Sequence, residues 1–134
     1  YASLEENAVV KHGVGGSAIG STNGASVDTK DYSEALVILA TGVAVATGTL
    51  DVKIQDSADN SSWADVTGAV FAQLVAADDQ ALKIARLKLD GNTVRRYIRA
   101  VGVVGTATVD YAVTFVLSGS QYKPQAVNAV AFTK

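Results

Sequence analysis

The stretch that decides the fold is TATVDYAVTFVLS, residues 106–118. Apolar side chains occur there at every second position, and these are Ala107, Val109, Tyr111, Val113, Phe115 and Leu117. The positions between them include Thr108, Asp110, Ala112 and Thr114. A period of two is that of a β-strand, because successive side chains point to opposite faces. The stretch therefore predicts a strand with one face in a hydrophobic core.

Similar alternation extends upstream. In residues 49–56, Leu50, Val52 and Ile54 alternate with polar side chains, and residues 94–104 also predict a long strand. The segment SADNSS, residues 57–62, is a cluster of turn-forming residues between Ile54 and Trp63. It predicts a hairpin, because Asp, Asn and Ser make the local hydrogen bonds that turns require.

Two other segments depart from simple alternation. Residues 34–41, EALVILAT, are an almost continuous apolar run, which predicts a strand buried on both faces. In residues 81–90 the apolar positions shift by one between Ile84 and Leu87. One extra residue near Ala85 and Arg86 would restore the period, so we expect a β-bulge there.

Strands joined by short turns, with no amphipathic helical stripe, predict an all-β fold. We expect an antiparallel β-sandwich that resembles a jelly roll, with an extended N-terminal arm and a C-terminal tail. The expected boundaries are 1–33 for a glycine-rich arm with short strands near 8–11 and 25–29, 34–118 for the sandwich body, and 119–134 for the tail.

The composition excludes several classes of function. Hydrophobic residues make up 49% of the 134 residues and charged residues 18%, which is typical of a folded domain. With no cysteine and one histidine, the chain lacks thiolate sites and any site that needs two imidazoles. A net charge of −2 gives no electrostatic basis for binding nucleic acid or an anionic membrane. The apolar run 35–50 is too short for a membrane span, and no basic segment precedes it as in a signal peptide.

The sequence offers little catalytic or ligand-binding chemistry. His12 has no nucleophile or orienting partner nearby in the sequence, so we expect an exposed or interface histidine rather than a catalytic one. Gly13, Gly15 and Ala18 match a loose dinucleotide-binding spacing, but the following residues IGSTNG do not predict the required helix. The acidic residues around the SADNSS turn suit a turn better than a cation site. We therefore predict no enzyme activity, no cofactor and no metal.

One basic cluster lies near the end of the predicted body. It contains Arg95, Arg96 and Arg99, with Tyr97 among them. Such a cluster with an aromatic residue is also found in platforms for single-stranded nucleic acid, but the chain is acidic overall. A salt-bridge surface between subunits is the use we predict for Arg95 and Arg99.

Three blocks of the sequence resemble small virion proteins encoded in the head-gene region of tailed bacteriophages. They are GTLDVKIQDSADNSSWADVTGAVF, LVAADDQALKIARLKLDG and RRYIRAVGVVGTATVDYAVTFVLSGSQYKP, and the likeness covers roughly residues 34–124. It implies a capsid decoration, or cement, protein. The further implications are assembly in the host cytoplasm, a position on the outer surface of the virion capsid, the major capsid protein as partner, and a homotrimer.

The predicted arm and tail supply most of the expected contacts, because extended ends can add strands to a partner's sheet. The predicted interface residues are Val9, Val10, His12, Val14, Arg95, Arg99, Tyr122, Val127, Val130 and Phe132. The 49% hydrophobic content exceeds what so small a core needs, so we expect part of it to be buried between subunits. Two alternatives stay open, a tail or head-fibre component and a carbohydrate- or receptor-binding module.

Overall fold

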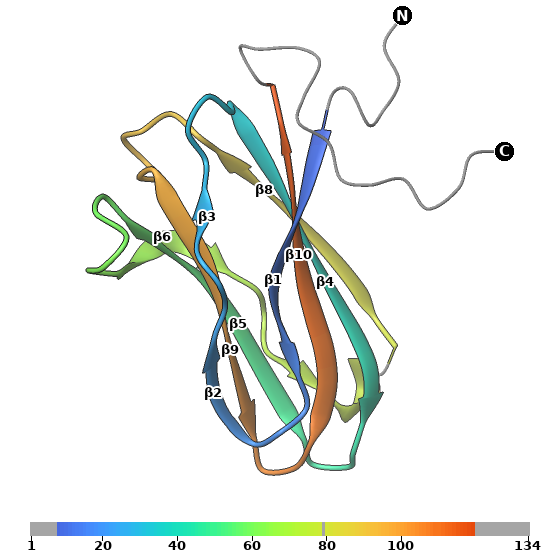
Figure 1. Cartoon of the computed structure of the whole chain (residues 1–134). Helices are drawn as coiled ribbons and strands as arrows, with labels where there is room; N and C mark the ends of the chain where they lie inside the picture. Colours follow the sequence, from blue (N-terminus) through green and yellow to red (C-terminus); the bar gives the residue numbers. More distant parts are fainter. Residues whose placement is uncertain (1–7, 79, 120–134) are drawn as a thin grey trace, which may run out of the picture.

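Two antiparallel β-sheets face each other in the computed structural model, which describes residues 8–78 and 80–119 (Figure 1). The four-stranded sheet has the order β1 (Ala8–Gly16), β10 (Val109–Ser118), β4 (Glu34–Ala44) and β8 (Leu82–Lys88). The six-stranded sheet has the order β2 (Gly20–Asn23), β9 (Tyr97–Gly105), β5 (Thr49–Ser57) and β6 (Ala64–Val70), with β3 (Val27–Asp28) on β9 and β7 (Leu74–Val75) on β5. The predicted all-β sandwich is confirmed.

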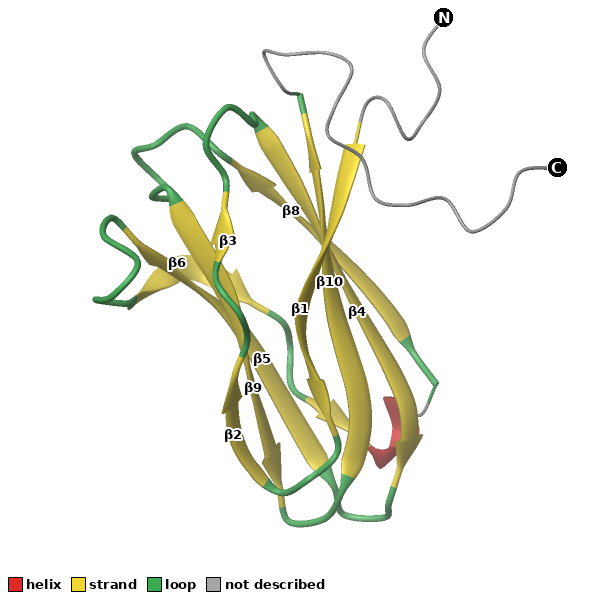
Figure 2. Cartoon of the chain, in the orientation of Figure 1, coloured by secondary structure: helices red, strands yellow, loops and turns green. Residues whose placement is uncertain are grey.

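The only helical element in the described part of the chain is a short 3-10 helix, Ala76–Asp78 (Figure 2). None of the described helical segments is long and apolar enough to cross a membrane.

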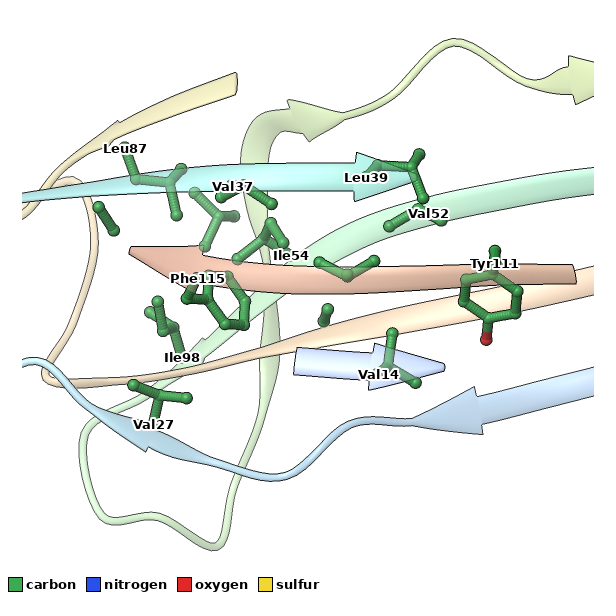
Figure 3. Packing of buried hydrophobic residues seen from close by; sticks show 14 of the residues in the cluster. Val14, Val27, Val37, Leu39, Val52, Ile54, Leu87, Ile98, Tyr111 and Phe115 are labelled. Atoms are coloured by element: carbon green, nitrogen blue, oxygen red, sulfur yellow. The ribbon is translucent and has the colours of Figure 1, made fainter. Parts of the chain in front are cut away.

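The core lies between the sheets, where the alternation in the sequence places it. The inward side chains of β10 are each at most 6% exposed, and they are Val109, Tyr111, Val113, Phe115 and Leu117. The six-stranded sheet contributes Leu50, Val52, Ile54 and Ile98 to the same cluster (Figure 3). The predicted hairpin is also present, because β5 pairs with β6 across the SADNSS turn.

The short strands predicted near residues 8–11 and 25–29 are present within β1 and as β3, but the N-terminal segment is not an extended arm. Its described residues complete both sheets, since β1 pairs with β10 along almost its whole length, while β2 and β3 pair with β9. The side chains of Val9 and Val14 are each 3% exposed. Residues 8–28 are therefore part of the sandwich, and deleting them would remove an edge strand from each sheet. Residues 1–7 and the predicted tail beyond Gly119 lie outside the described part of the chain.

The structure contradicts the predictions of full burial for residues 34–41 and of a β-bulge in residues 81–90. In β4 the side chains of Ala35, Val37 and Leu39 are buried, but those between them are partly or fully exposed. Strand β8 pairs with β4 in one continuous register from Leu82 to Lys88, so there is no bulge in it. The apolar positions change face instead, with Leu87 in the core and Leu82 and Ile84 on the outside.

Candidate assembly interface

The outer face of the four-stranded sheet carries a continuous set of apolar side chains. We call it the apolar sheet face, and it consists of Val10, Leu36, Ile38, Ala40, Leu82, Ile84, Ala112 and Val116. Its most exposed large members are Leu82 at 63%, Ile84 at 59% and Val10 at 45%. A contiguous exposed apolar patch of this kind typically marks an interaction site.

The strand register makes these side chains neighbours across all four strands. One row runs from Val10 to Val116 to Leu36, and a second places Ile38 between Thr114 and Ile84. A third row joins Ala112, Ala40 and Leu82. Residues at i and i+2 of one strand share a face, so the rows stack into one surface.

Charged residues lie at both ends of this surface. At one end Arg86 contacts Glu34, with 3.3 Å between Nε and Oε1, and Lys88 lies opposite Glu34 in the register. At the other end is Asp110, beside Gly42. An apolar centre with a charged rim is the usual anatomy of a protein–protein interface.

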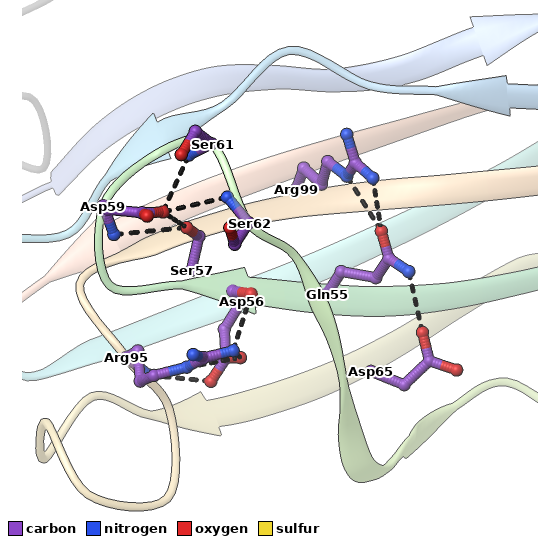
Figure 4. Close-up of polar contacts among 9 residues, drawn as sticks. All are labelled: Gln55, Asp56, Ser57, Asp59, Ser61, Ser62, Asp65, Arg95 and Arg99. Atoms are coloured by element: carbon purple, nitrogen blue, oxygen red, sulfur yellow. Dashed lines mark hydrogen bonds and ion pairs between the residues drawn. The ribbon is translucent and has the colours of Figure 1, made fainter.

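The outer face of the six-stranded sheet is polar by contrast. Asp65 accepts hydrogen bonds from Gln55 Nε2 at 2.8 Å and from Lys53 Nζ at 2.9 Å. The same glutamine accepts two hydrogen bonds from Arg99, at 2.9 and 2.7 Å (Figure 4). The Arg99 guanidinium also stacks 4.5 Å from the centroid of the Trp63 ring. These contacts satisfy the polar groups within the chain, so this face offers few unpaired charges to a partner.

Hydrogen bonds from Arg95 connect the loop before β9 to Asp56 at the end of β5. The Arg95 guanidinium donates to Asp56 Oδ1 from Nε at 2.9 Å and from Nη2 at 2.6 Å, and the backbone N–H of Arg95 donates to Asp56 Oδ2 at 2.9 Å (Figure 4). Burial alone would raise the pKa of Asp56, but these donors outweigh it and hold the pKa below 3.8. The ion pair between Arg95 and Asp56 therefore stabilises the fold of one chain.

The SADNSS hairpin has the structural role predicted for it. Asp59 accepts hydrogen bonds from the backbone N–H groups of Ser61 and Ser62, each at 2.9 Å, and from the Ser57 hydroxyl. These donors, with Ser62 first, lower the pKa of the Asp59 carboxyl. Within the described residues, no three acidic or histidine side chains are grouped so that they could hold a metal ion.

Two depressions on the surface carry little reactive chemistry. One, of about 250 Å³, lies where β6 and β8 leave the side of the sandwich open, and no acidic residue or histidine lines it. The other, of about 470 Å³, lies at the loop end among Tyr32, Leu89 and Arg96, and Asp31 is its only carboxylate.

The predicted interface residues fall into three groups. Val10 and His12 project from β1 on the outer side of the four-stranded sheet, opposite Val116 and Thr114. Val9 and Val14 are buried within the chain, while Arg95 and Arg99 bind the chain's own Asp56 and Gln55. The other four residues, Tyr122, Val127, Val130 and Phe132, lie outside the described residues.

The sequence reasoning missed the centre of the apolar sheet face. The prediction for residues 34–41 buries Leu36 and Ile38 as well. The predicted bulge near Ala85 and Arg86 puts Leu82 and Ile84 on the same face as Leu87. The usable signal was the period in residues 82–88, which is regular if Leu82 and Ile84 point away from the core. A strand that is apolar on both faces also requires a cover on each face.

The low pKa values of several aspartates predict how the stability of the fold depends on pH. Several aspartates have pKa values below the ordinary 3.8, and they are Asp28, Asp56, Asp59, Asp65 and Asp90. For Asp28 the main cause is its hydrogen bond with Arg96. At low pH the unfolded chain therefore binds more protons than the folded chain, so stability falls as the pH drops below about 4. We expect a lower urea midpoint at pH 3 than at pH 6. The Asp56→Asn variant should show a smaller difference between the two pH values, and an equal difference would contradict this assignment.

Two solved structures share the fold of this chain. The chain is similar to the PBSX phage exported protein XepA, with a TM-score of 0.58 and 14% identity over 94% of this chain. It is also similar to VP2 of the infectious bursal disease virus subviral particle, with a TM-score of 0.56 and 12% identity over 84% of this chain. The chain spans only 42% and 32% of the lengths of these two proteins. No family model and no curated protein matches the sequence.

Identities this low establish a shared fold and nothing more.

Proposed function

We propose that this chain is a non-enzymatic structural protein of a virion, a decoration protein that binds the outer surface of a tailed-phage capsid. The observation that carries the proposal is the apolar sheet face, which is typical of a subunit in a permanent protein assembly. The resemblance of residues 34–124 to head-gene decoration proteins and the viral origin of the two fold neighbours support it. The partners are the major capsid protein and further copies of this chain.

A decoration protein stabilises a shell by mass action. Any protein that binds the assembled capsid but not its separated subunits stabilises the assembly, by about 2.7 kcal/mol per site at a hundredfold excess over the dissociation constant. A rigid sandwich suits this role, because little conformational entropy is lost when it binds.

The alternative of a carbohydrate-binding module requires an exposed aromatic platform. Trp63 is partly buried, and the Arg99 guanidinium covers one face of its ring. Tyr97 carries the Arg96 guanidinium 4.9 Å from its ring centroid, and Tyr111 is in the core. These contacts disfavour that alternative.

The proposal is tested by adding purified protein to capsids that lack it. We expect saturable co-sedimentation at micromolar concentration, a copy number set by the symmetry of the shell, and a higher temperature of capsid disruption. Bovine serum albumin at the same concentration is the control for trapped protein. Failure to co-sediment, or binding only to tails, would contradict the proposal.

A further inference from the structure

The apolar sheet face is more apolar than a solvent-exposed sheet surface should be. Antiparallel sheets with one face in water normally alternate apolar and polar side chains. Strand β5 follows that rule, because buried Leu50, Val52 and Ile54 alternate with polar side chains. Strand β4 does not, since Leu36, Ile38 and Ala40 occupy its outward positions. Its sequence is that of a strand with protein on both sides.

The size of the surface fits a protein partner. Four strands at about 4.8 Å spacing and about ten residues long at about 3.3 Å per residue give a face of roughly 600 Å². Two such faces in contact bury on the order of 1,200 Å², the lower limit of a standard specific interface. A single short peptide strand would leave most of the width of this face uncovered.

We propose that the apolar sheet face is the contact between copies of this chain, and that its occupant is the same face of a second copy. This rests on the proposed assembly of several copies, although it does not require the capsid. Two identical faces in contact join two copies, so the proposed contact makes a pair and differs from the trimer that the resemblance implies. A second copy is favoured because Leu82 and Ile84 need a cover from the time the chain folds, before any shell is encountered. Identical chains made together supply that cover at once, and the same patch on both subunits is the commonest way that soluble proteins associate.

The charged ends of the face suit such a contact. Glu34, Arg86 and Lys88 lie at one end and Asp110 at the other, so both signs of charge are present on the rim. Arg86 lies opposite Leu36 at the β8 end of the first row, and the other two rows contain no aspartate, glutamate, lysine or arginine. Association therefore buries apolar side chains at the centre and leaves charges in contact with water.

Two isoleucines provide a matched test. Ile84 lies on the apolar sheet face and Ile19 lies between β1 and β2, and each is 59% exposed. By sedimentation equilibrium we expect the wild type to have twice the 13.8 kDa mass of one chain. Ile84→Glu should raise the dissociation constant at least a hundredfold, because it buries a charge in the contact, while Ile19→Glu should change it less than threefold. Monomeric wild type at about 100 μM, or equal effects of the two substitutions, would overturn the proposal.

The chain has no cysteine, so single-cysteine variants report which partner covers the face. We expect the thiol of Ile84→Cys to be protected from a maleimide at high protein concentration and to become reactive on dilution, with Ile19→Cys reactive throughout. Protection that does not depend on dilution would show that a segment of the same chain covers the face, and would overturn the proposal. A negative capsid-binding result would leave these outcomes unchanged, so the two proposals fail separately.

Discussion

Phe115→Ala is expected to lower the free energy of unfolding by about 3–5 kcal/mol, which is a large part of the total for a domain of this size. Phe115 is 0% exposed and is the largest fully buried side chain in the described part of the chain. It belongs to the cluster that joins β10 to Ile54 and Ile98 of the opposite sheet (Figure 3). Removing the ring leaves a cavity between two hydrogen-bonded sheets, which cannot collapse to fill it.

The matched control is Phe71→Ala, because Phe71 is only partly buried at the edge of the same cluster. We expect it to cost about 1–2 kcal/mol, since it removes less buried area and leaves no closed cavity. Urea unfolding followed by Trp63 fluorescence measures both variants. Equal losses for the two phenylalanines would contradict the assignment of Phe115 to the centre of the core.

Gly102→Ala is the second large effect, with an expected loss of about 3 kcal/mol. A Cβ atom at residue 102 would lie 2.5 Å from Tyr111 Cζ and 2.6 Å from Cε2, and it would also overlap the hydroxyl oxygen. Gly102 is in β9 and Tyr111 in β10, so the ring spans the space between the sheets. An alanine in a regular strand normally stabilises slightly, so the expected sign is reversed here by steric overlap.

Two variants separate steric overlap from a general effect of replacing glycine. Gly42→Ala in β4 meets only Asp110 Cβ, at 3.1 Å, on the outside of the sheet, so we expect a change of less than about 1 kcal/mol. Combining Gly102→Ala with Tyr111→Leu should restore part of the loss, because the shorter side chain makes room. Purely additive losses in this double-mutant cycle would contradict the proposed contact.

The strands that were predicted well have one face in the core and one in water. In β5 and β10 the burial of alternate residues determines which side chains are apolar, so the pattern in the sequence reports the fold directly. The SADNSS turn was equally clear, because Asp59 makes the local hydrogen bonds for which its residue type is selected in turns.

The short strands predicted near residues 8–11 and 25–29 are present within β1 and as β3, but the full length of β1 and the strand β2 could not be predicted in this way. Strand β2 has the sequence GSTN and all four of its residues are exposed, so no apolar pattern marks it. The glycines that suggested a loop are needed for close packing: a Cβ at Gly13 would lie 2.8 Å from the Val113 carbonyl oxygen, and one at Gly24 would overlap the Gly13 carbonyl oxygen. These requirements come from strands distant in sequence, and local propensity does not report them.

The apolar sheet face could not be identified from the sequence for a related reason. A run such as residues 34–41 does not show whether its second cover comes from the same chain or from another one. The high hydrophobic content predicts that some apolar residues are buried between subunits. From the sequence alone, these residues are expected mainly at the two ends of the chain. The structure instead exposes apolar residues on the outer side of β4 and β8.

The most direct test of the proposed virion role is an electron cryomicroscopy reconstruction of virions purified from cells that produce this chain. The proposed function predicts two-sheet density outside the capsid shell, repeated with the symmetry of the shell, with the apolar sheet faces of neighbouring copies in contact. Particles that lack the chain, or that carry it only on the tail, would contradict the decoration role.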